Sequence, residues 1–143
     1  MKSIIRHEIA ATTARDIVAA AVDYAAGKGW AVCAAICDPR GHMVSLARSD
    51  EVIAPAIQFA IDKAYTSGTL GKSTQAFFGR ATARPALAMG LANRERILVF
   101  PGGIPIISAE LCLGGLGVSG AQDEEDVECA RTVLERFGFD VTE

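Results

Sequence analysis

The spacing of apolar residues predicts helices and short strands in alternation along the chain. Apolar side chains recur at helical spacing over residues 12–26, and two glycines follow as stop signals. The predicted helix would turn one face toward a core: Ile17, Ala20, Ala21 and Tyr24.

The next segment, Trp30–Cys37, alternates like a half-buried strand. One face would carry Trp30, Val32, Ala34 and Ile36, and the other would carry Ala31, Cys33, Ala35 and Cys37. The second set is small enough for a helix to pack closely on it. Residues 38–41, Asp-Pro-Arg-Gly, predict a tight turn, because proline presets φ and glycine accepts positive φ. His42–Arg48 would then return as the second strand of a hairpin, with Val44 and Leu46 on the face of Arg48.

The second half of the chain continues the mixture of helices and strands. Strand pairs joined by short turns imply an antiparallel sheet with helices stacked on it, an α+β layer fold. The expected helices are Pro55 to about Ser67, a short one capped by Ser73 or Thr74, one or two turns over Pro85–Ala92, and Asp123–Phe137 with Val127, Ala130 and Leu134 inward. The expected strands are Ile97–Phe100, Ile104–Ile107 and Leu111–Val118.

Composition predicts where the protein resides in the cell and whether its chains associate. The 143 residues are 50% hydrophobic, which fits one domain over residues 1–143, but only 6% are aromatic. A core of small residues buries little area, so we expect a homo-oligomer, dimer or higher. A formal net charge of −3 argues against nucleic-acid binding. No membrane span or signal peptide is visible, and the four cysteines lack metal-site spacing, so we expect reduced thiols in a cytoplasmic protein.

Two glycine motifs resemble nucleotide-binding sequences but lack the surrounding residues and elements that such sites need. Residues 115–120 match G-x-G-x-x-G, but too little chain follows to close a βαβ unit, so we interpret these glycines as packing and turn residues. Gly71-Lys72-Ser73 resembles the end of a P-loop, but its first glycine would be Thr66.

Taken together, several motifs resemble the GlcG/HbpS family, which includes the C-terminal domain of PduO-type proteins. The resemblance covers roughly residues 12–137 and departs from the family pattern at Ser49 and over Ser73–Asn93. The matching segments are Gly102-Gly103-Ile104-Pro105-Ile106, Gly114–Ala121, Asp38-x-x-Gly41 with Arg48-x-Asp50, Asp62-Lys63-Ala64, and Asp126 with Cys129-Ala130.

The resemblance implies a five-stranded antiparallel sheet flanked by helices, in a profilin-like arrangement. It also implies homo-oligomers, and haem or corrinoid-related ligands in some members. Many members belong to small-molecule catabolic operons. The adenosyltransferase activity of PduO proteins resides in a separate domain that has no counterpart in this sequence, so it is not carried over.

Several residues are candidates for a ligand or catalytic site. Arg48 ends a strand and could hold a carboxylate, or could pair structurally with Asp50 or Glu51. Lys63 lies mid-helix and could bind an anion, act as a base or form a Schiff base, or could be a snorkelling or ion-paired lysine. Gly102 and Gly103, with Pro105 beside them in the motif, could present backbone N–H groups to an anion, or form a turn.

The remaining candidates are Glu110 and the two histidines. Glu110 lies at a hairpin tip, as a solvated turn residue, a general base or a metal ligand. His42 follows a turn glycine and is expected at the surface. His7, on the N-terminal arm, is the candidate haem ligand. Catalysis by a thiolate at Cys112 or Cys129 lacks a neighbouring histidine.

These features support two main functional hypotheses. The first is a small-ligand protein of the GlcG/HbpS type that binds haem, another tetrapyrrole or an anionic metabolite as an accessory to a catabolic pathway. The alternative is an enzyme that hydrolyses or isomerises a carboxylate-bearing intermediate, with Arg48 and the glycine amides holding the carboxylate and Lys63 or Glu110 moving a proton. A structural accessory subunit is a third possibility.

Overall fold

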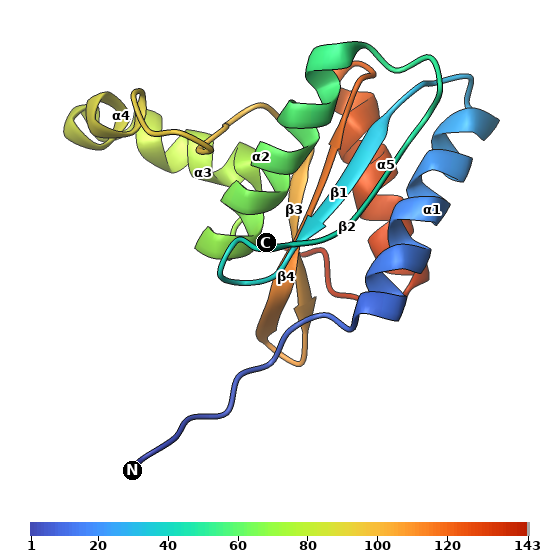
Figure 1. Ribbon diagram of the computed structural model, residues 1–143. Helices are drawn as coiled ribbons and strands as arrows, with labels where there is room; N and C mark the ends of the chain where they lie inside the picture. Colours follow the sequence, from blue (N-terminus) through green and yellow to red (C-terminus); the bar gives the residue numbers. More distant parts are fainter. Residues whose placement is uncertain (143) are drawn as a thin grey trace.

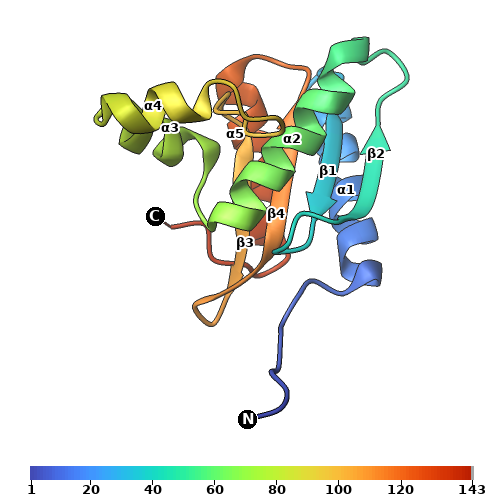
Figure 2. The ribbon, with the colours of Figure 1, turned by 60° about the vertical axis from the view of Figure 1, so that its left-hand side comes forward.

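A computed structural model of the protein describes residues 1–142. One antiparallel sheet has the strand order β2-β1-β4-β3. The strands are β1 (Cys33–Cys37), β2 (Met43–Arg48), β3 (Gly103–Ser108) and β4 (Leu111–Ser119). Helices α1 (Ala11–Gly27) and α5 (Asp123–Arg136) cover one face, and α2 (Ala54–Leu70) covers the other (Figure 1). Helices α3 (Thr74–Thr82) and α4 (Pro85–Leu91) project to one side of the sheet (Figure 2).

The two faces of β1 divide the core as its alternation predicts. Val32, Ala34 and Ile36 pack with α1 and α5, in a cluster completed by Ile104, Ile106, Leu116 and Val118 of the neighbouring strands. Cys33, Ala35 and Cys37 face α2, where Ala56, Ala60 and Ala64 meet them. The prediction of one large-residue face and one small-residue face is therefore confirmed.

Helix α2 packs on β4 nearly backbone to backbone, because both elements carry glycine at the contact. A Cβ on Gly117 would collide with the carbonyl oxygen of Ala60, and a Cβ on Gly115 would collide with the backbone nitrogen of Gly68. The glycines of the G-x-G-x-x-G match are packing residues, as the sequence interpretation held. This close approach fixes the position of α2, and with it the position of Lys63.

The fifth strand expected at Ile97–Phe100 is absent, and this prediction was wrong. Threonine hydroxyls, instead of a neighbouring strand, satisfy the backbone of this segment. The Thr66 hydroxyl donates to the Arg96 carbonyl at 2.9 Å and accepts from the Leu98 N–H at 2.9 Å. The Thr74 hydroxyl donates to the Phe100 carbonyl at 2.7 Å. The sheet therefore has four strands, and the segment lies along α2 and α3.

Two smaller differences concern which face a side chain occupies. A bulge at Ile36/Cys37 shifts the pairing of β1 with β2, so Val44 packs into the α1–α5 cluster instead of sharing the face of Arg48. In α5 the inward stripe is Asp126, Cys129, Ala130, Val133 and Leu134, with Val127 half-buried. Across residues 1–142 no helix has the length and apolar character needed to cross a membrane.

Candidate functional site

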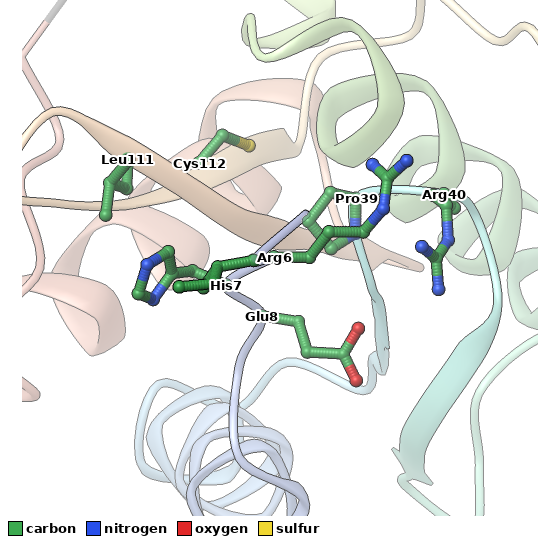
Figure 3. Close-up of a pocket in the computed structure, with 8 residues that line it drawn as sticks. Arg6, His7, Glu8, Pro39, Arg40, Leu111 and Cys112 are labelled. Carbon is green, nitrogen blue, oxygen red and sulfur yellow. The ribbon is translucent and has the colours of Figure 1, made fainter. Parts of the chain in front are cut away.

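A cavity of about 250 Å³ lies where the N-terminal arm passes the sheet. Three separate parts of the chain line it: the arm, the β1–β2 turn and the start of β4 (Figure 3). The lining residues are Ile5, Arg6, His7, Glu8, Pro39, Arg40, Leu111 and Cys112. Two guanidinium groups, one imidazole and the Glu8 carboxylate therefore border a partly apolar hollow.

The β1–β2 turn that carries Arg40 is held by Asp38. The Gly41 N–H donates to the Asp38 carbonyl at 3.0 Å, and the Asp38 carboxylate accepts from the Arg40 N–H at 2.8 Å and the His42 N–H at 3.1 Å. Burial acts to raise the pKa of Asp38, but these N–H donors and the His42 ring outweigh it, so the pKa lies below its ordinary value. An ionised Asp38 thus fixes the turn that presents Arg40.

The arm is fixed at its base and presents its side chains in two directions. The Ile9 N–H donates to the Leu113 carbonyl of β4 at 2.8 Å, which ties the arm beside the sheet. Figure 3 shows the Arg6 side chain extending toward Pro39 and Arg40, while the His7 ring points the other way, toward Leu111. The His7 side chain is exposed, and neither of its ring nitrogens has a hydrogen-bond partner within residues 1–142.

Cys112 brings a sulfur to this cavity. Burial raises the pKa of Cys112 above its ordinary value, although a backbone hydrogen bond at Gly114 opposes the shift. Its Sγ lies 3.5 Å from the Gly68 carbonyl oxygen and 3.4 Å from that of Gly114, to which it donates. All four cysteines are free. No group of three or more His, Cys, Asp or Glu side chains in residues 1–142 could hold a bare metal ion.

Lys63 is buried at a different place, between α2, β4 and α5. Its ammonium donates to the Val118 carbonyl at 2.8 Å and to Asp126 at 3.3 Å, and the side chains of Lys63 and Asp126 are only 2% and 4% exposed. Burial lowers the pKa of Lys63, partly offset by Asp126, and burial raises the pKa of Asp126, partly offset by Lys63. Asp126 also accepts from the Ala121 N–H at 3.0 Å, so this pair joins three elements.

The glycine pair of the family motif lies against Lys63. A Cβ on Gly102 would come within 2.9 Å of the Lys63 ammonium, and Gly102 has φ +123°, a value that favours glycine. The Gly103 N–H donates to the Thr74 hydroxyl at 3.1 Å, so a protein group already occupies it. Pro105 is buried in β3 opposite Gly115. The structure thus brings Lys63, Gly102 and Gly103 together.

Arg48 and Glu110 lie elsewhere. Arg48 is exposed and borders an open hollow of about 560 Å³ with Trp30, Asp50 and Glu51. Its guanidinium has no carboxylate within salt-bridge distance in residues 1–142, and its one hydrogen bond is to the Ser49 carbonyl at 3.4 Å. Glu110 is exposed at the tip of the β3–β4 hairpin, with φ 64°. His42 is exposed, as expected, with its Nδ1 3.0 Å from Asp38.

Comparisons with known proteins place the chain in a family. The family model described as "Haem degrading protein HbpS-like" matches residues 9–135. The chain belongs to the HbpS-like family. A 15.0 kDa protein from the dhaT–dhaS intergenic region of Citrobacter freundii is 30% identical over 103 residues, which cover 71% of this chain and 72% of that protein.

Solved structures share the fold of this HbpS-like chain. The Klebsiella pneumoniae protein ORFY, of the DUF336 family, is 28% identical, with a TM-score of 0.87 over 96% of this chain and 95% of its own. A double mutant of HbpS from Streptomyces reticuli is 24% identical, with a TM-score of 0.87 over 96% and 92%. A PduOC:heme complex is 21% identical, with a TM-score of 0.85 over 95% and 99%.

Sequence reasoning singled out two lining residues of the arm cavity of this HbpS-like chain, His7 as a haem ligand and Cys112 as a weak candidate thiolate. It missed Arg6 and Arg40, because the arm and the turn are 34 positions apart and carry no shared motif. The signal that was present is the Asp38-x-x-Gly41 motif. Its aspartate has a structural reason to be there, since it holds the turn that presents Arg40.

Proposed function

We propose that this protein binds haem, or a closely related tetrapyrrole, in the cavity at the N-terminal arm. His7 would be the iron ligand, and Arg6 and Arg40 would hold the propionate carboxylates. The observation that carries the proposal is the meeting of an unpartnered imidazole with two guanidinium groups around one partly apolar cavity. Imidazole is a common axial ligand of haem iron, and guanidinium groups bind carboxylates bidentately.

The residues present suit each part of such a ligand. Ile5, Pro39 and Leu111 would give the flat macrocycle apolar contact, and Arg6 and Arg40 bring one positive charge more than Glu8 offsets. Arg6 and His7 are neighbours in the chain, but their side chains point in opposite directions (Figure 3). The iron-binding imidazole would therefore lie apart from the guanidinium group that binds a propionate. Bound haem supplies a ligand-binding or redox-active iron, and the chain's own part is to ligate it and orient the ring.

The relatives support the choice of ligand. The family description names haem, and one structural neighbour is a complex with heme. A cavity of about 250 Å³ can hold only one part of a tetrapyrrole. A second copy of this chain would therefore cover the rest of the ring. Four free thiols fit the reducing cytoplasm. In this role the protein would be an accessory to a pathway of small-molecule catabolism.

A haemin titration followed by absorbance tests the proposal. The native protein should give a saturable Soret shift, and His7→Ala should lose the ligation signature while His42→Ala, the matched control, retains it. Arg6→Ala and Arg40→Ala should each raise the dissociation constant about tenfold, the equivalent of one charge-assisted hydrogen bond of about 1.4 kcal/mol. Arg84→Ala, an exposed arginine away from the cavity, should change nothing. An unchanged spectrum in His7→Ala would refute the assignment of the ligand.

One observation favours a second candidate function. The exposed Arg48 guanidinium, without a carboxylate partner, borders the hollow of about 560 Å³ and could hold a small carboxylate metabolite, as a binding protein or an enzyme would. Under this alternative, Arg48→Ala would lose binding or turnover of small carboxylates while remaining folded. Equal activity of Arg48→Ala and native protein would remove Arg48 from the mechanism.

A further inference from the structure

The N-terminal arm leaves the body of the molecule with its apolar side chains uncovered. Figures 1 and 2 show the first residues extending away from both the sheet and the helices. Ile4 is 64% exposed and Ile5 is 87% exposed. Two basic residues, Lys2 and Arg6, flank them. A short apolar and basic segment of this kind has the composition of a segment that docks on another surface.

A groove of complementary character runs along α3. Two adjoining hollows of about 430 and 350 Å³ share Gln75, Pro101 and Asp123. The first is lined mainly by apolar side chains, among them Phe78 and Phe100, which are about half exposed. Asp123 and Glu124, at the start of α5, line the second hollow and give this surface an acidic rim. We call this surface the α3 groove, defined by Gln75, Phe78, Val99, Phe100, Pro101 and Asp123.

We propose that the α3 groove receives the N-terminal arm of a second copy of this chain. Ile4 would enter the apolar floor beside Phe78 and Phe100, and Lys2 would lie against the acidic rim. Charge and apolar character match on both sides: the arm is apolar and basic, and the groove is apolar and acidic.

The position of the arm favours docking on a second copy over docking on the α3 groove of its own chain. Ile9 is tied to Leu113 near the β3–β4 hairpin, whereas Phe100 and Pro101 precede β3 at its other end. The arm runs away from α3 in both ribbon views. Ile5 to Glu8 line the arm cavity of their own chain, so the free part of the arm is the four residues before them, which reach at most about 14 Å when extended. The α3 groove of the second copy must therefore lie close beside this cavity. Two copies could exchange arms reciprocally, in the self-complementary manner of a twofold dimer.

A photo-crosslinking experiment on the ligand-free protein tests this proposal independently of haem. A benzophenone amino acid replaces Ile4, and chains labelled with heavy nitrogen are mixed with unlabelled chains before illumination. We expect crosslinks between labelled and unlabelled chains, mapped by mass spectrometry to the segments 75–78 and 99–101. Phe78→Asp should reduce their yield at least tenfold. Met89→Asp, which alters an exposed apolar residue of α4 outside the α3 groove, should leave the yield unchanged.

Several results would overturn the proposal. Crosslinks within one chain, crosslinks that map to other surfaces, or a Phe78→Asp variant with full yield would each do so. The absence of crosslinks between chains at the highest concentration where the protein stays monodisperse would also do so. Phe78 is half exposed, so its replacement should leave the fold intact, and circular dichroism of the variant confirms this before illumination.

Discussion

Replacing Asp126 by asparagine tests whether Lys63 is a structural cation. In the native protein the two side chains are almost fully buried, with the Lys63 ammonium 3.3 Å from the Asp126 carboxylate and 2.8 Å from the Val118 carbonyl. Asp126→Asn keeps the shape and an oxygen that can accept from Ala121, but it removes the charge opposite Lys63. The lysine must then remain as an uncompensated buried cation or give up its proton.

The cost of either outcome is large. Keeping Lys63 neutral at pH 7 costs about 1.4 kcal/mol for each pH unit below its ordinary pKa of 10.5, which amounts to about 5 kcal/mol. Burial of the native ion pair already carries a desolvation cost, so the variant loses less than this full amount. We expect Asp126→Asn to lower the free energy of unfolding by about 3–5 kcal/mol. This is a large part of the about 5–15 kcal/mol that stabilises a typical domain.

Urea unfolding between pH 7 and 9 supplies the assay. In the variant the unfolded state binds one more proton than the native state, so stability should rise with pH by about 1.4 kcal/mol per unit while Lys63 is neutral in the fold. The double variant Lys63→Met/Asp126→Asn should recover most of the loss. Asp16→Asn, in an exposed pair with Arg15 at 3.9 Å, is the control and should change stability by less than about 0.5 kcal/mol. A loss below about 1 kcal/mol without pH dependence would refute the reasoning.

Three other substitutions test the helix–sheet packing, a threonine hydrogen bond and the charge of a turn residue. Gly117→Ala should destabilise the protein by about 1–3 kcal/mol in urea unfolding, because its Cβ would collide with α2; an unchanged midpoint would contradict the close packing. Thr66→Val should cost about 1–3 kcal/mol and accelerate amide exchange at Leu98, whose N–H loses its acceptor; normal protection would argue against this anchor. The ionised Asp38 should stabilise the native protein over Asp38→Asn by about 1 kcal/mol above the ordinary pKa of 3.8. Because the folded pKa lies lower still, this difference should disappear as the pH falls through it, and a constant difference down to pH 2 would count against the role of the charge.

Local pattern was enough to predict most of the fold. Alternation along β1 assigns its two faces correctly, because burial on each side follows directly from the sequence period. The same reasoning failed at Ile97–Phe100, where a short apolar run has the composition of a buried strand. Whether such a run pairs depends on its neighbours, and here hydroxyl groups on α2 and α3 take the place of a strand.

The candidate site was less predictable, since distant segments build it. The motif residues Lys63, Gly102 and Gly103 do come together, but around Asp126, whose partnership with Lys63 no spacing rule reveals. Arg6 and Arg40 meet at the arm cavity because one backbone hydrogen bond at Ile9 ties the arm to β4. The long-range contacts that create this cavity lie outside what periodicity can show.

A crystal structure of the haemin-loaded protein, with iron located by anomalous scattering, tests the central claim most directly. The account predicts one iron site per cavity, at coordination distance from the His7 imidazole, with the propionates on Arg6 and Arg40. Iron located at His42 or beside Arg48, or no ordered iron in crystals of a stoichiometric complex, would contradict it.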